Sequence, residues 1–234
     1  MNYSKKNVKK QKRNFNNKKA KAKKKFSLHF LKSILICLLV IIAAALVAFA
    51  IYATVLIKKL PDISQVNITP SGYSTSVLDS DGNEIESLAS SGANRTYVTM
   101  DHIPEDVAHA FVAIEDSRFY KHNGIDIRGI VRATFVGVLS GGDFSQGAST
   151  ITQQLLKNNY FTSWTSETSF INRLNRKIQE QYLAVQLEKV TDKNTILENY
   201  LNTINLGQNT LGVEAASERY FNKSVSDLNL SEAA

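Results

Sequence analysis

The run ILICLLVIIAAALVAFAIYATVLI, residues 34–57, decides how the rest of the chain is arranged, because it contains 24 residues without a charge. As an α-helix it is roughly 36 Å long, which is enough to cross a hydrocarbon core of about 30 Å. It is too long and too apolar for the core of an ordinary signal peptide, and no small-x-small cleavage site follows it. The run therefore predicts a retained transmembrane helix, and a cleaved signal peptide is the alternative.

The residues before this run, 1–33, form a strongly basic tail. They hold 13 of the 28 Lys and Arg residues of the chain and no Asp or Glu. The positive-inside bias predicts a cytoplasmic tail on the anionic inner leaflet, and its low content of apolar residues predicts disorder. Everything after Lys58 is then extracytoplasmic and has roughly six more acidic than basic side chains, so no nucleic-acid partner is expected. Cys37, the only cysteine, lies inside the apolar run, so no intrachain disulfide is expected.

Beyond the run we expect a connector over residues 58–74 and a single domain over residues 75–234. A small β-hairpin is expected at the start of the domain, over residues 75–88, with its turn at Asp81-Gly82. The rest of the domain repeats its apolar residues at helical spacing, so the predicted fold class is mainly α.

Two helix starts in this domain are marked by candidate caps. Asp192 is expected to cap a helix that continues to about residue 202, and Ser226 is expected to cap the last helix. The sequence stops within that last helix without a terminating residue. We therefore expect a domain that is C-terminally incomplete.

Three polar clusters carry candidate chemistry, and the first is EDSRFYKHNG, residues 115–124. Glu115 directly follows an apolar helical pattern, so it lies where a helix leaves the core. A half-buried carboxylate in such a place can act as a general base. The alternative is a solvated helix end in which Glu115 pairs with Arg118.

The second cluster is GASTITQQLLKN, residues 147–158. Ser149 is a plausible cap for a helix whose first backbone N–H groups would favour an anion. Gln154 and Lys157 are three residues apart, so their side chains can reach one phosphate group. An ordinary capped helix with a polar outer face is the alternative, and the Gly-Lys-Ser/Thr of a P-loop is missing.

The third cluster consists of Arg173, Arg176, Lys177 and Glu180, which fall along one stripe of a predicted helix. A solvated face of ion pairs is the alternative that the helix alone favours. Together with Glu115, Glu180 would supply a pair of carboxylates, the usual arrangement for chemistry at a glycosidic bond.

These clusters occur in the order and rough spacing of a known family. The motifs are Glu115-Asp-x-x-Phe-x-x-His-x-Gly, Ser149-Thr-Ile-Thr-Gln-Gln, Arg176-Lys-x-x-Glu and Lys193-x-x-Ile-Leu-Glu-x-Tyr-Leu-Asn, with a partial fifth from Gly212 to Lys223. The chain resembles the peptidoglycan glycosyltransferases (glycosyltransferase family 51) over about residues 75–234. These form the N-terminal catalytic domain of class A penicillin-binding proteins and the whole of the monofunctional transglycosylases. Ala148 is a small departure, because the family often has Gly there.

The resemblance implies a lysozyme-like fold of two lobes and the polymerisation of lipid II into β-1,4 glycan strands with inversion and release of undecaprenyl pyrophosphate. Glu115 would be the catalytic general base, and Glu180 would either hold a divalent cation (Mg²⁺ or Mn²⁺) or orient the neighbouring cations. No organic cofactor is expected. His122, Glu198 and Asn202 would either brace the cleft or touch substrate. The residues expected to bind the leaving group are Lys157, Arg173, Arg176 and Lys177. The other expected substrate contacts are Arg132, Ser149, Gln153 and Gln154.

The expected partners are the bilayer, lipid II, the growing glycan strand and other proteins of cell-wall synthesis. Apolar side chains between residues 124 and 170, including Phe135 and Trp164, are expected to enter the lipid surface. Two other functions are open: a membrane-bound lytic enzyme that cleaves glycan strands, and a non-catalytic scaffold. A lytic enzyme has no need for a cationic pyrophosphate site, and a scaffold would tolerate loss of the carboxylates.

Overall fold

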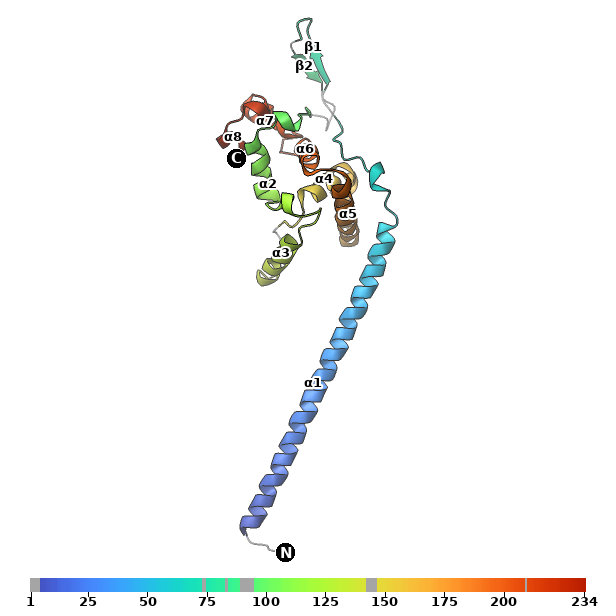
Figure 1. The fold of residues 1–234 in the computed structure, drawn as a ribbon, viewed down its shortest axis with the longest axis vertical. Coiled ribbons are helices and arrows are strands. Elements are labelled where there is room, and N and C mark those ends of the chain that lie inside the picture. Colours follow the sequence, from blue (N-terminus) through green and yellow to red (C-terminus); the bar gives the residue numbers. More distant parts are fainter. Residues whose placement is uncertain (1–4, 73–74, 83, 89–94, 142–146, 209) are drawn as a thin grey trace. The chain divides into compact units, whose positions relative to one another are not determined.

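The computed structural model describes residues 5–72, 75–82, 84–88, 95–141, 147–208 and 210–234. Residues 73–74 of the expected connector lie outside these ranges. The chain divides into two compact units, Met1–Val55 and Leu56–Ala234. Figure 1 labels the elements of both.

Most of the first unit is a single helix. Helix α1 extends over Lys5–Ile57, and its stretch Phe30–Ile57 is the one helix in the described ranges that is long and apolar enough to cross a membrane. The prediction of a disordered tail was wrong for the residues that are described, because α1 continues back to Lys5. The physical reason is that Lys and Ala, which are abundant in the tail, are good helix formers.

The second unit begins with a short 3-10 helix, Ile63–Gln65, and the predicted β-hairpin. Strands β1 (Thr75–Leu78) and β2 (Glu84–Leu88) pair antiparallel, with Thr75 opposite Leu88 and a register shift between Val77 and Leu78. Gly82 in the turn has φ +86°, a left-handed conformation that glycine adopts without strain.

The remainder of this unit is helical, as predicted (Figure 1). The helices are α2 (Glu105–Glu115), α3 (Ile127–Leu139), α4 (Ile151–Asn159), α5 (Phe170–Val190), α6 (Lys193–Leu201), α7 (Val213–Phe221) and α8 (Leu230–Ala233). Short 3-10 helices lie between them at Met100–His102, Phe119–Lys121, Thr162–Ser166 and Val225–Asp227.

The core is built around α4, which packs against both α5 and α6. Ile151, Leu155 and Leu156 on α4 are fully buried. They meet equally buried side chains from α5 and α6, namely Leu183, Ala184, Ile196, Leu197 and Leu201. Because α4 is enclosed in this way, its polar N-terminal residues and Lys157 near its other end are held on a rigid element.

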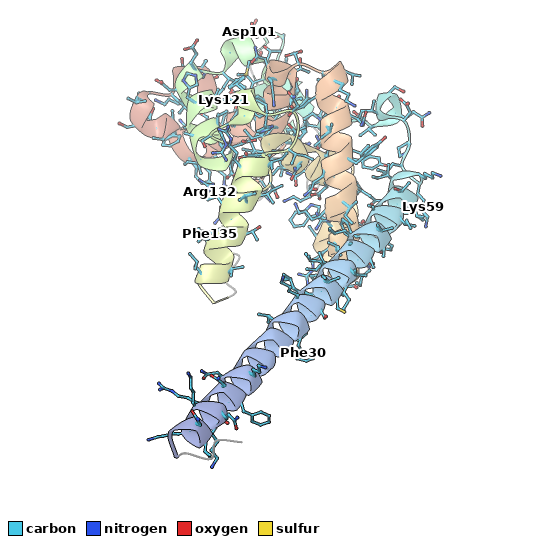
Figure 2. All side chains as sticks on the ribbon, turned by 60° about the horizontal axis from the view of Figure 1, so that its bottom comes forward. Phe30, Lys59, Asp101, Lys121, Arg132 and Phe135 are labelled. Atoms are coloured by element: carbon cyan, nitrogen blue, oxygen red, sulfur yellow. The ribbon has the colours of Figure 1, made fainter. Side chains whose placement is uncertain are left out.

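Helix α3 has the opposite character. Its buried residues are the small ones, Gly129, Ala133 and Gly137, while Phe135 is 65% exposed. Figure 2 shows Arg132 close to the body of the domain and Phe135 further along the same helix. Trp164 was also among the side chains expected to enter lipid, but its ring lies against the ammonium of Lys157.

The predicted caps are right at one helix and displaced at two. Asp192 accepts a hydrogen bond from the Thr195 N–H at 2.9 Å and caps α6 as expected. Helix α4 is capped by Thr150 instead of Ser149. Ser226 lies inside the 3-10 helix Val225–Asp227, and α8 is capped by Asn229, with Glu232 completing a capping box.

Candidate active site

Glu115 is the last residue of α2, and its side chain is exposed. Its Oε2 accepts a hydrogen bond of 2.9 Å from the side-chain amide of Gln154 on α4. Arg118 does not pair with Glu115: its guanidinium binds Asp126 instead. The alternative of a simple Glu115–Arg118 ion pair is therefore wrong, and Glu115 is held by an uncharged donor.

The next residue, Asp116, is buried and ties the end of α2 to the start of α4. Its Oδ2 accepts hydrogen bonds from the Ile151 backbone N–H at 3.1 Å and from the His122 Nε2 at 2.8 Å. A carboxylate held by two such donors is fixed in orientation. Because Glu115 is the preceding residue, this anchor also sets the position of its carboxylate.

The loop between α2 and α3 is pressed against α5 at Gly124. This glycine has φ +85°, and a Cβ added to it would lie 2.5 Å from the backbone carbon of Ala184. The Thr150 hydroxyl donates to the Gly124 carbonyl at 2.8 Å, and the Gln153 amide lies 3.3 Å from the same oxygen. The loop thus needs glycine here, and the side chains of Gln153 on α4 and of its cap, Thr150, hold it.

Glu115 lines a small polar cavity of about 120 Å³. Arg132 of α3 and Ser149, just before α4, line the same cavity. Three residues that the sequence placed in the site are therefore brought together from three parts of the chain. The other residues that line this cavity are Ala113, Ile114, Asp116, Ser117, Asp126, Gly129, Gly147, Ala148 and Thr150.

A cationic cluster lies on α5 beside Ser149. Arg176 is 8% exposed; its Nε lies 2.9 Å and 3.0 Å from the two carboxylate oxygens of Glu167, and its Nη1 binds Glu180. The Lys177 Nζ donates to Glu180 Oε2 at 2.8 Å and to the Ser149 Oγ at 2.9 Å. Ser149 therefore touches the cationic cluster and lines the cavity that holds Glu115.

The buried state of this cluster contradicts the alternative of a solvated ion-pair face. Glu180 is completely buried and Arg176 nearly so. Burial lowers the pKa of Arg176, but hydrogen bonds to Glu167 and Glu180 outweigh it and raise that pKa. Arg173 is the exception, since its side chain is exposed and has no ion-pair partner in the ranges that the structure describes.

Lys157 approaches the same cluster from α4. Burial first, and then the positive charge of Lys177, lower the pKa of Lys157, while the Glu180 carboxylate acts in the opposite direction. Its Nζ lies 4.3 Å from the centre of the Trp164 ring, a cation–π contact. Lys157 thus shares its surroundings with Arg176, Lys177, Glu180 and Glu115.

Glu180 does not have the surroundings of a metal ligand. Both of its oxygens are bound by cationic side chains, and among the described residues there is no group of three His, Cys, Asp or Glu that could hold a metal ion. Magnesium prefers several oxygen donors around it. The donor set at Glu180 therefore fits the orientation of Arg176 and Lys177, and it does not fit a metal ion held by the protein.

The side chains of four other predicted residues form hydrogen bonds that hold parts of the domain together. Gln153 is 2% exposed and braces Gly124, so the structure does not bring it to the lining of the cavity. His122 binds Asp116. Glu198 accepts from the Met100 N–H at 2.6 Å, and Asn202 forms a pair of hydrogen bonds with the Val98 backbone, at 2.7 and 2.9 Å.

Tyr200 on α6 lies close to the two carboxylates at the end of α2. Burial, and then the negative charges of Glu115 and Asp116, raise its pKa, so its hydroxyl stays protonated.

Sequence reasoning missed Glu167, which belongs to no motif and lies nine residues before its partner Arg176. Trp164, the sole tryptophan of the chain, was predicted only as a lipid contact, and its contact with Lys157 was missed.

Comparison with known proteins defines the class of the chain. The Transglycosylase family model matches residues 81–234, so the chain belongs to the Transglycosylase family. Penicillin-binding protein 1A of Clostridium perfringens (strain 13 / Type A) is 42% identical over 208 residues, which is 88% of this chain and 30% of that protein.

Two further relatives extend the comparison. Penicillin-binding protein 1A of Clostridium tetani is 41% identical over 223 residues, 93% of this chain and 27% of that protein. Penicillin-binding protein 1F of Bacillus subtilis is 42% identical over 161 residues, 69% of this chain and 21% of that protein. The chain therefore spans less than a third of the length of these relatives.

Proposed function

We propose that the chain is a peptidoglycan glycosyltransferase that polymerises lipid II into β-1,4 glycan strands in cell-wall synthesis. The observation that carries this proposal is the contact of Lys177 with Ser149, because it joins the cavity of Glu115 to a cluster of three cations. A general base next to a pyrophosphate-binding site is what this transfer needs. A lytic enzyme would need the carboxylates without the cations.

In the proposed reaction Glu115 takes the proton of the 4-hydroxyl of the acceptor sugar as that oxygen attacks the anomeric carbon of the growing strand. The new C–O bond forms on the face opposite the breaking bond, so an α-linked donor gives a β-linked product. The bonding electrons leave with undecaprenyl pyrophosphate. Gln154 holds the Glu115 carboxylate in place through its 2.9 Å hydrogen bond.

The negative charge that develops on the leaving group would be stabilised by Lys157, Arg176 and Lys177. For Glu180 we propose the orienting role, since its oxygens hold Arg176 and Lys177. No step then needs a metal ion held by the protein or an organic cofactor. Arg132 and Ser149, which line the cavity with Glu115, are proposed contacts of the sugar substrates.

We further propose that residues 34–57, within the apolar stretch Phe30–Ile57, anchor the chain in the bacterial cell membrane, with residues 1–33 in the cytoplasm and the catalytic domain outside. The long apolar helix supports the anchor, and the lysines of the tail support the orientation. Lipid II, the growing strand and the bilayer are then the immediate partners, and other proteins of cell-wall synthesis share the same membrane.

Replacement of Glu115 by Gln tests the proposal, because it removes the proton acceptor and keeps the shape of the side chain. We expect polymerisation of lipid II in detergent to fall by about 10²–10⁴-fold. Glu105→Gln is the matched control, since Glu105 is an exposed carboxylate at the other end of α2. A Glu115→Gln variant that polymerises as fast as the control would refute the assignment.

A further inference from the structure

Two cations of the proposed leaving-group site, Lys157 and Arg176, each contact the same short turn. Lys157 lies against the ring of Trp164, and Arg176 binds the carboxylate of Glu167. Both partners belong to the segment that leads from α4 into α5, which includes the 3-10 helix Thr162–Ser166 and its C-terminal cap Glu167. Neither partner lies in a motif of the family resemblance.

The turn is internally tied, so its two contacts are not independent. The Glu167 N–H donates to the Trp164 carbonyl at 3.3 Å, and the Trp164 N–H donates to the Phe161 carbonyl at 3.0 Å. Phe161 in turn packs against the core and against the ring of Tyr160. A displacement of Trp164 would therefore also move Glu167, and with it the guanidinium of Arg176.

The charges of the cluster explain why one partner is aromatic and the other is acidic. Glu167 and Glu180 bind Arg176 and Lys177 directly. Lys157 has no ion pair among the described residues, and Glu180 and Glu115 act on it only through their charge. A carboxylate at position 164 would neutralise the Lys157 ammonium that the leaving group is proposed to bind. An aromatic face offsets part of the desolvation of the Lys157 ammonium without adding a formal negative charge.

The bonds of Arg176 leave a donor for the ligand as well. Glu167 takes the Nε edge of the guanidinium and Glu180 takes Nη1. Nη2 has no acceptor among the described residues. A guanidinium held at two of its three nitrogens can present its remaining N–H groups to a phosphate with little loss of entropy.

We infer that the turn Thr162–Glu167 positions the pyrophosphate-binding cations, with Trp164 holding Lys157 and Glu167 holding Arg176. This inference rests on the proposed function, because it specifies how the site for the leaving group is held before substrate arrives. Trp164 and Glu167 are positioning residues that act through Lys157 and Arg176, and pre-positioned charges need no reorganisation when the bond breaks.

The fluorescence of Trp164 tests the inference directly, because this is the only tryptophan of the 234-residue chain. With the chain in detergent micelles, we expect inorganic pyrophosphate to change the emission of Trp164 as the anion engages the ammonium on its ring. Lys157→Gln should remove the response, and Lys189→Gln, at an exposed lysine in the last turn of α5, should leave it intact. An emission that does not respond, or that responds equally in Lys157→Gln, overturns the inference.

Kinetics with lipid II give a second test. We expect Trp164→Ala to lower kcat about tenfold, the effect of a cation–π contact of ordinary strength, and Trp164→Phe to recover much of the loss. Glu167→Gln should also lower kcat, while Thr165→Ala, at an exposed side chain of the same turn, should match the wild type. Equal losses in Trp164→Ala and Trp164→Phe, or no loss in either, overturn the inference.

The two tests separate this inference from the function on which it rests. The fluorescence assay uses pyrophosphate alone and needs no polymerisation. If the wild-type chain responds to pyrophosphate but does not polymerise lipid II, the proposed function fails and the positioning role stands. If it polymerises lipid II while the Trp164 and Glu167 variants behave as the wild type, the positioning role fails alone.

Discussion

At the scale of single residues, two cations that look alike in the sequence have different surroundings in the structure. Arg173 and Arg176 are both arginines of α5, three residues apart. Arg176 is 8% exposed and bound by two carboxylates, whereas Arg173 is exposed. Helical spacing alone treats the two alike, because it records a face of the helix and not its contacts.

This contrast gives a prediction. Arg176→Ala should reduce polymerisation of lipid II by at least about tenfold, because a desolvated guanidinium is lost beside the leaving group. Arg173→Ala should stay close to the wild type. Initial rates of both variants, measured with melting temperatures to exclude unfolding, check this. Equal losses would mean that the whole cationic stripe binds substrate, as the sequence suggested.

Much of the site was readable from the sequence because its motifs are local. Glu115 was a candidate from its place after an apolar helical pattern and Lys157 from its spacing to Gln154, while the roles expected of both came from the family resemblance. What the sequence could not supply are partners that only the tertiary fold brings together. Asp116 meets the backbone of Ile151 across 35 positions, and no periodicity encodes such a contact.

At the scale of elements, the caps show where local chemistry is sufficient and where packing decides. Asp192 was predicted because an Asp directly before an apolar helical pattern is a local signal for a helix cap. Ser149 and Thr150 are both able to cap α4, and Thr150 does so because its hydroxyl also binds the Gly124 carbonyl at 2.8 Å. That second bond leaves Ser149 free to accept from Lys177.

The cap of α6 predicts how stability depends on pH. The N–H and hydroxyl of Thr195 lower the pKa of Asp192, so its charge stabilises the folded state above the ordinary carboxyl pKa of about 4. This contribution is lost as the pH falls through the lowered folded-state value. Asp192→Ala should therefore cost about 1 kcal/mol at pH 7 and less at pH 3.

Denaturant unfolding of the domain at both pH values checks this, with Asp192→Asn as the control. Asn is an equally good cap that carries no charge, so this variant should keep most of the stability at both pH values. A cost for Asp192→Ala that does not shrink on acidification would show that the side chain acts through packing, and the charge argument would then be wrong.

At the scale of the whole molecule, the distribution of charge along the chain supports the proposed orientation in the membrane. The 13 Lys and Arg residues before position 34 face no acidic residue in the same segment, while the chain beyond the apolar run is net acidic. A short segment rich in Lys and Arg resists transfer across the membrane, whereas a long domain is transferred largely regardless of its charge. The proposed function agrees with this orientation, because a lipid-linked donor would be bound at the membrane surface.

Cysteine labelling in cells tests this orientation, because Cys37 is the only cysteine and can be replaced by Ala. In that background we would place one cysteine in the tail, Lys12→Cys, and one in the exposed turn of the hairpin, Ser80→Cys. A maleimide that does not cross membranes should label Ser80→Cys in intact cells and label Lys12→Cys only after lysis. Labelling of Lys12→Cys in intact cells would reverse the orientation. The catalytic domain would then be placed in the cytoplasm, away from the strands that it is proposed to extend.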